Sequence, residues 1–181
     1  MNGDLKAKLN VFYGLAPGKK RRVARKDIIS DLEKMNFYDR LADVSEILHD
    51  EHLSIEKLDL FRRIDTDVIM TLYSKMLSST NPEVWNTILN VILNIHSYTA
   101  AERFKLFANA LNNSEPTVRN CGLDHIDYLL NEVYEGVQDP RDRDEELIKT
   151  VVLHLKKFYE TEKVEWVRET AKDIWEARNL D

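Results

Sequence analysis

The feature that most constrains the fold is a segment that occurs twice, 34 residues apart. Residues 78–92 read SSTNPEVWNTILNVI, and residues 112–126 read NNSEPTVRNCGLDHI. In both copies small polar residues precede a proline, and a valine two positions later begins an apolar run. Proline suits the first position of a helix because it lacks the backbone N–H that would be unpaired there. The two copies therefore predict the same turn followed by the same helix.

The similarity extends into the helix before each turn. Between residues 67–97 and 101–131, nine positions agree in apolar or proline character. A helix–turn–helix unit that recurs at a fixed interval is typical of an α-solenoid. A third unit follows after a longer interval, and its second helix, KVEWVRETAKDIWE, has Val167 in the place of Val118. The extra length falls in the polar segment 135–145 and in a slightly longer turn.

Apolar residues follow helical spacing along most of the chain, and no segment shows the sustained alternation of a strand. The predicted fold class is therefore all-α, with about nine or ten helices. The predicted helices are 5–12, 26–35, 37–49, 54–63, 67–79, 82–97, 100–112, 116–134, 144–160 and 164–178. The segment YGLAPGKKRR is predicted as a loop.

Two of these segments resemble a known family. EPTVRNCGLDHIDYL and KVEWVRETAKDIWEA are similar to the second helix of HEAT repeats, in which proline, valine and arginine are followed by a small residue and leucines. Arg119 and Arg168 take the arginine position, and Gly122 and Ala171 take the small one. The resemblance covers about residues 64–178 and implies a right-handed α-solenoid whose second helices line a concave, macromolecule-binding surface. The first repeat departs from the pattern, since Trp85 stands in the arginine position and Ile88 in the small one, and the third repeat lacks the proline.

These patterns predict a single domain with three regions. Residues 1–26 form a basic N-terminal segment, and residues 27–63 form a divergent helical unit or cap. Residues 64–181 hold three HEAT-like repeats, at 64–98, 99–134 and 144–178.

Charge is distributed unevenly over these regions. The net charge of −6 combines +7 in residues 1–26 with −13 in the remainder. An acidic body attracts basic partners and repels nucleic-acid phosphates. The basic stretch KKRRVARK is open to three interpretations: a contact for nucleic acid or an acidic partner, a nuclear address, or a solvated segment against the acidic body. We favour the last, since no aromatic residues are interleaved to stack on bases.

A single cysteine, no apolar run long enough for a signal peptide and no membrane span predict a cytoplasmic protein that does not enter a membrane. No catalytic motif is recognisable, so we expect no enzyme activity, cofactor or metal. The segment HDEH, with His49 and His52, is interpreted as a helix end, because metal binding would need further ligands. Cys121 is interpreted as a small core residue.

The predicted binding residues lie on the second helices. Asn86, Asn90 and Asn94 recur every four residues and form one stripe. At the repeat offset they are followed by carboxylates and amides of the next two helices. The predicted partner-binding residues are Asn86, Asn90, Asn94, Asn120, Asp124, Asp127, Asn131, Glu169, Asp173 and Glu176. An ordinary solvated helix surface is the alternative interpretation.

Three functions fit these observations. The first is a non-enzymatic protein-binding module that is a monomer when free and clamps a basic partner. By analogy of class, we expect an immunity protein or antitoxin, a toxin inhibitor whose carboxylates occlude the basic groove of a nuclease. The second is a HEAT scaffold or adaptor for a peptide or helix. The third, nucleic-acid binding, is disfavoured by the acidic repeats.

Overall fold

The computed structural model describes residues 3–48, 66–93, 98–134 and 144–177. Every regular element within these ranges is helical, so the all-α prediction is confirmed. The chain divides into two compact units, Met1–Met76 and Leu77–Asp181. The boundary lies inside the first predicted repeat, and each unit is described by itself. The predicted helix 54–63 lies outside the described residues.

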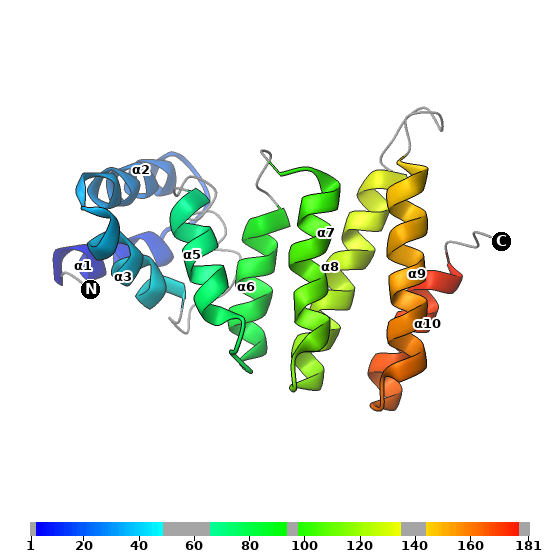
Figure 1. Ribbon diagram of the computed structural model, residues 1–181. Helices are drawn as coiled ribbons and strands as arrows, with labels where there is room; N and C mark the ends of the chain where they lie inside the picture. Colours follow the sequence, from blue (N-terminus) through cyan, green and yellow to red (C-terminus); the bar gives the residue numbers. More distant parts are fainter. Residues whose placement is uncertain (1–2, 49–65, 94–97, 135–143, 178–181) are drawn as a thin grey trace. The chain divides into compact units, whose positions relative to one another are not determined.

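The first unit contains four described α-helices (Figure 1). They are α1 (Gly3–Tyr13), α2 (Lys19–Lys34), α3 (Phe37–Leu48) and α5 (Thr66–Met76). Helices α1 and α2 pack together, as do α3 and α5. Apolar side chains at helical spacing form the buried face of α1, where Leu5, Leu9 and Phe12 are almost fully covered.

The basic stretch corrects one prediction, because it is helical and not a loop. Helix α2 begins at Lys19, seven residues before the predicted start, and contains all of KKRRVARK. Lysine, arginine and alanine are good helix formers, which favours this extension. Arg21 is buried, with its guanidinium 4.8 Å from the centre of the Phe12 ring and its Nη1 donating to the Leu15 carbonyl at 3.2 Å. At least one charge of the stretch therefore holds α2 against α1.

The second unit contains five described α-helices and one short 3-10 helix. They are α6 (Pro82–Leu93), α7 (Ala100–Ala108), η1 (Asn109–Asn112), α8 (Pro116–Tyr134), α9 (Glu145–Thr161) and α10 (Glu165–Glu176). Helix α8 has the predicted bounds. The prediction of one helix over 100–112 is nearly right, since α7 continues into the tighter helix η1.

The helices of the second unit form two rows (Figure 1). Helix α8 packs against α6 on one side and α10 on the other, and we call these three the second-helix row. Helices α7 and α9 pack side by side and form the first-helix row. Contacts of α7 with α8 and of α9 with α10 join the rows.

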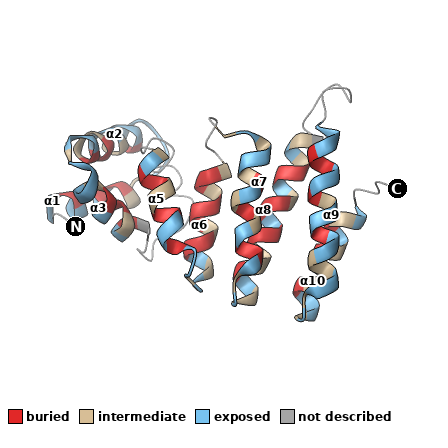
Figure 2. Ribbon diagram, in the orientation of Figure 1, coloured by how far each residue is buried: buried red, intermediate tan, exposed pale blue. Residues whose placement is uncertain are grey.

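Burial has the same register in all three helices of the second-helix row. Figure 2 shows the buried residues of α6 and α8 in red, alternating with less buried ones. Val84, Val118 and Val167 are buried at matching positions. One turn later the matching buried residues are Ile88, Gly122 and Ala171. A β-carbon on Gly122 would lie 2.9 Å from Cβ of Ala110, so the small residue of the repeat permits the close approach of η1 to α8.

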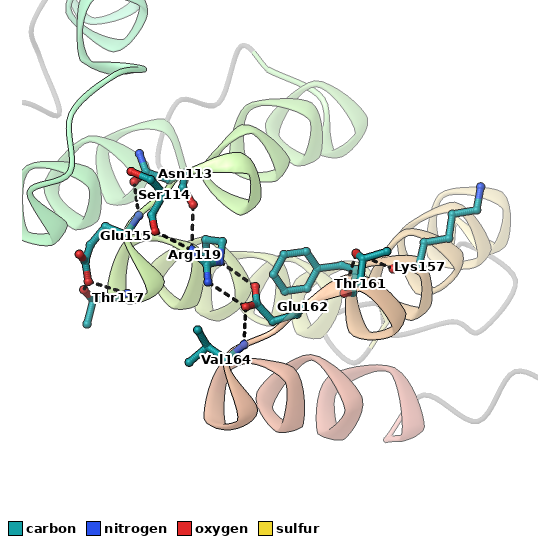
Figure 3. Close-up of polar contacts among 10 residues, drawn as sticks. Asn113, Ser114, Glu115, Thr117, Arg119, Lys157, Thr161, Glu162 and Val164 are labelled. Carbon is teal, nitrogen blue, oxygen red and sulfur yellow. Dashed lines mark hydrogen bonds and ion pairs between the residues drawn. The ribbon is translucent and has the colours of Figure 1, made fainter.

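A polar ladder links the turns that precede the second helices. Asn113 Nδ2 donates to the Ser79 carbonyl at 2.7 Å. Figure 3 shows Arg119 joining the next two turns: its Nη1 donates to the Asn113 carbonyl at 2.9 Å, and its Nε and Nη2 reach both carboxylate oxygens of Glu162 at 2.7 and 2.8 Å. Glu162 also accepts from the Val164 amide at 2.8 Å. Arg119, which takes the arginine position of the repeat pattern, therefore links the turns of the second and third predicted repeats.

Candidate binding face of the second-helix row

The described members of the predicted binding set all lie on the second-helix row. Asn86 and Asn90 lie on α6, Asn120, Asp124, Asp127 and Asn131 lie on α8, and Glu169, Asp173 and Glu176 lie on α10. Each keeps some exposure to solvent, and the side chains of Asp124, Asp173 and Glu176 are the most open. Because α8 packs against both other helices, the structure brings these residues onto adjacent elements. Asn94 lies outside the described residues.

The asparagines of α6 form hydrogen bonds within their own helix. Asn90 Nδ2 donates to the Asn86 carbonyl at 2.8 Å and to Asn86 Oδ1 at 3.0 Å. Asparagine commonly bonds to nearby backbone in this way. The stripe is therefore weaker support for a binding surface than its spacing indicated, because part of its bonding capacity is already used.

Carboxylates and an amide crowd together on α8. Asn120 Nδ2 lies 3.3 Å from Oδ2 of Asp124 and 3.4 Å from its Oδ1. Within the described residues, the buried Oδ1 of Asn120 receives no hydrogen bond. Partial burial raises the pKa of Asp124, and the nearby charge of Asp127 raises it further. A cation placed here would relieve this repulsion.

Formal charge separates the two rows. The helices of the second-helix row carry 3 lysine and arginine residues against 8 aspartate and glutamate residues, a net of −5. The first-helix row carries 5 against 4, a net of +1. Two of these charges are paired: Arg119 of α8 with Glu162, and Glu132 of α8 with Arg103 of α7. Acidity is thus concentrated on one side of the second unit.

Two exposed aromatic side chains lie on the second-helix row, and neither is among the predicted binding residues. Tyr128 on α8 is 60% exposed, and Trp166 on α10 is 48% exposed. Tyr128 follows Asp124 by four residues, so the two share a helix face. That spacing was visible in the sequence, but the exposure of the ring was not.

Cys121 and His125 do not form a catalytic pair. The Cys121 thiol donates to the Pro82 carbonyl at 3.8 Å, and burial together with Asp124 raises its pKa to about 11. Nδ1 of His125 lies 2.8 Å from the Cys121 carbonyl, and burial lowers the pKa of this imidazole. The thiol is thus protonated at neutral pH, and a thiolate nucleophile is disfavoured.

Within the described ranges, no group of three or more histidine, cysteine or acidic residues has the arrangement of a metal site. His49 and His52 lie outside those ranges. In the same part of the chain, no helix is both long and apolar enough to cross a membrane.

Comparison of the chain with protein-family models, with curated proteins and with solved structures gives no match. The resemblance to HEAT repeats stays a prediction.

Proposed function

We propose that the protein is a non-enzymatic binding module that holds a basic protein partner on its second-helix row. The observation that carries this proposal is the difference in charge between the rows, −5 against +1. A surface with concentrated carboxylates speeds the approach of a positively charged protein and favours it over neutral competitors. The same field opposes nucleic acid on this row.

We further propose that the second unit is a short right-handed α-solenoid of the HEAT type. The two rows of helices, the matching burial of Val84, Val118 and Val167, and the small residue at Gly122 support this arrangement. In such a stack the second-helix row is the concave side. Short, parallel, stacked helices would present the carboxylates to one partner at once.

Within this class of function, the inhibitor is the form we favour. A nuclease toxin has a basic substrate groove, and an acidic row can fill that groove without performing chemistry. A single cysteine cannot form a disulfide within the chain, which suits a reducing compartment such as the cytoplasm. A scaffold or adaptor for a basic helix would use the same face and is the second candidate.

The test is a pull-down from the native host with the whole protein as bait. The variant Asp124→Lys/Asp127→Lys/Asp173→Lys reverses three charges of the second-helix row. The control Glu145→Lys/Glu146→Lys/Glu160→Lys reverses three exposed charges of α9 in the first-helix row. We expect one stoichiometric basic protein that is captured by wild type and control and lost by the first variant.

A partner that binds all three proteins equally would contradict the proposed face. Nuclease activity of the captured protein, suppressed on rebinding, would favour the inhibitor over the scaffold. Circular dichroism of each variant checks that the helices remain folded.

A further inference from the structure

The second-helix row contains two large aromatic side chains that packing does not explain. Tyr128 and Trp166 are 60% and 48% exposed, whereas Trp85 of the same row is 1% exposed. Tyrosine and tryptophan are, together with arginine, the residue types most enriched at the energetic centres of protein interfaces.

Both aromatic side chains lie beside carboxylates. On α8, Asp124 precedes Tyr128 by one helical turn, and both residues are exposed. On α10, Glu169 follows Trp166 by three residues, about one helical turn, and Asp173 lies on the same face two turns, about 10.5 Å, from Trp166. Each helix therefore presents an aromatic ring and an acid together.

This combination suits one kind of cation. A guanidinium group is planar, stacks on an aromatic face and can bind a carboxylate through two parallel N–H donors. An ammonium group has neither the flat face nor the fork, and it is more strongly hydrated. The chain's own cations occupy only part of the site: Arg168 and Lys172 lie 3.7 and 3.9 Å from Glu169, on the same helix.

We propose that this face selects arginine over lysine in its protein partner, with Tyr128 and Trp166 stacking on guanidinium groups, Asp124 pairing with the group on Tyr128 and Glu169 pairing with the group on Trp166. The inference rests on the proposed function and adds the chemistry of the partner. It names an arginine-bearing protein segment as the occupant, because the net charge of the row opposes a phosphate backbone.

The test uses two synthetic probes of equal charge, an octa-arginine and an octa-lysine peptide, with affinities measured by calorimetry at fixed ionic strength. A cation–π contact at an exposed site is worth roughly two- to fivefold in affinity, and lysine can also form one, so two contacts predict a preference for the arginine peptide of at most about four- to twenty-five-fold. In Tyr128→Ala/Trp166→Ala the preference should fall below about twofold. Tyr128→Phe/Trp166→Phe keeps both rings and should keep most of it.

The chain offers matched controls. Tyr38 on α3 of the first unit is 79% exposed, and Leu153 on α9 of the first-helix row is 60% exposed. Tyr38→Ala and Leu153→Ala remove comparable exposed surface elsewhere, so both variants should keep the wild-type preference.

Three results would overturn the inference. The first is equal affinity for the two peptides; if binding is also lost in Asp124→Lys/Asp127→Lys/Asp173→Lys, the acidic face stands and only the arginine selectivity fails. The second is a preference that survives in Tyr128→Ala/Trp166→Ala. The third is tight binding of a single-stranded DNA octamer that is lost in that same variant, because the rings would then be stacking on bases.

Discussion

Trp85 shows how a residue outside the repeat pattern can make one hydrogen bond of the expected arginine. Trp85 and Arg119 occupy the same position in successive repeats. Trp85 Nε1 donates to the Ser79 carbonyl at 2.8 Å, and Arg119 Nη1 donates to the Asn113 carbonyl at 2.9 Å. Both acceptors lie six residues before the donor, in the turn that begins the helix. The departure from the HEAT pattern therefore preserves the hydrogen bond and changes the donor.

Replacing this indole should weaken the fold. Trp85→Phe removes the N–H and some buried volume, so we expect the free energy of unfolding to fall by about 1–3 kcal/mol. Urea denaturation followed by circular dichroism measures the change. Trp166→Phe is the matched control, because Trp166 is half exposed, and it should change stability by less than about 0.5 kcal/mol. Equal effects of the two substitutions would contradict this role for Trp85.

His125 makes stability depend on pH. Burial lowers the pKa of this imidazole from its ordinary value of 6.5, although the bond to the Cys121 carbonyl partly opposes the shift. Below pH 6.5 the unfolded chain therefore takes up a proton that the folded chain resists. The free energy of unfolding should be constant above about pH 7.5 and fall as the pH drops below 6.5, by at most about 1.4 kcal/mol per pH unit for this group.

Denaturant titrations between pH 5 and 8 measure this slope, with His125→Gln as the comparison. The variant should have a shallower slope. Part of the slope should remain, because burial and Lys157 also lower the pKa of His154. Identical slopes in the two proteins would show that His125 does not carry the effect.

At the scale of single elements, helices with a clear apolar spacing were predicted well, including the unrepeated α3 (Phe37–Leu48, predicted 37–49), whereas the start of α2 was misplaced. The bounds of α8 follow from its proline and from the copy 34 residues earlier. The start of α2 was misplaced because a run of cations is typical of both loops and solvated helices. Its packing against α1 depends on the stacking of Arg21 on Phe12, a long side-chain contact that helical periodicity does not reveal.

The junction of η1 and α8 depends on Gly122. A β-carbon there would also lie 3.2 Å from the Phe107 carbonyl, so Gly122→Ala forces backbone or Ala110 to move. We expect a net loss of about 1–2 kcal/mol in unfolding free energy, since overpacking outweighs the better helix propensity of alanine. Gly3→Ala in α1 has open space around it and should not destabilise the protein. A Gly122→Ala variant as stable as wild type would contradict this close approach.

At the scale of the molecule, the sequence predicted the all-helical class, and it placed the candidate binding residues on three helices that the structure packs in one row. It did not predict which of those residues remain available. The bonds of Asn90 to Asn86 and the contact of Asn120 with Asp124 depend on side-chain orientation, which spacing alone leaves open. The exposure of Tyr128 depends on which neighbours cover it. Tertiary packing, and not residue type, decides these features.

The most direct test of the acidic face is carboxylate footprinting of the whole protein with and without its captured partner. A carbodiimide and an amine label exposed carboxylates, and mass spectrometry measures each site. We predict that the partner reduces labelling of Asp124 and Asp173 on the second-helix row, while Glu145, Glu146 and Glu160 on α9 stay as reactive as in the free protein. Protection of the α9 carboxylates with undiminished labelling of Asp124 and Asp173 would contradict the account.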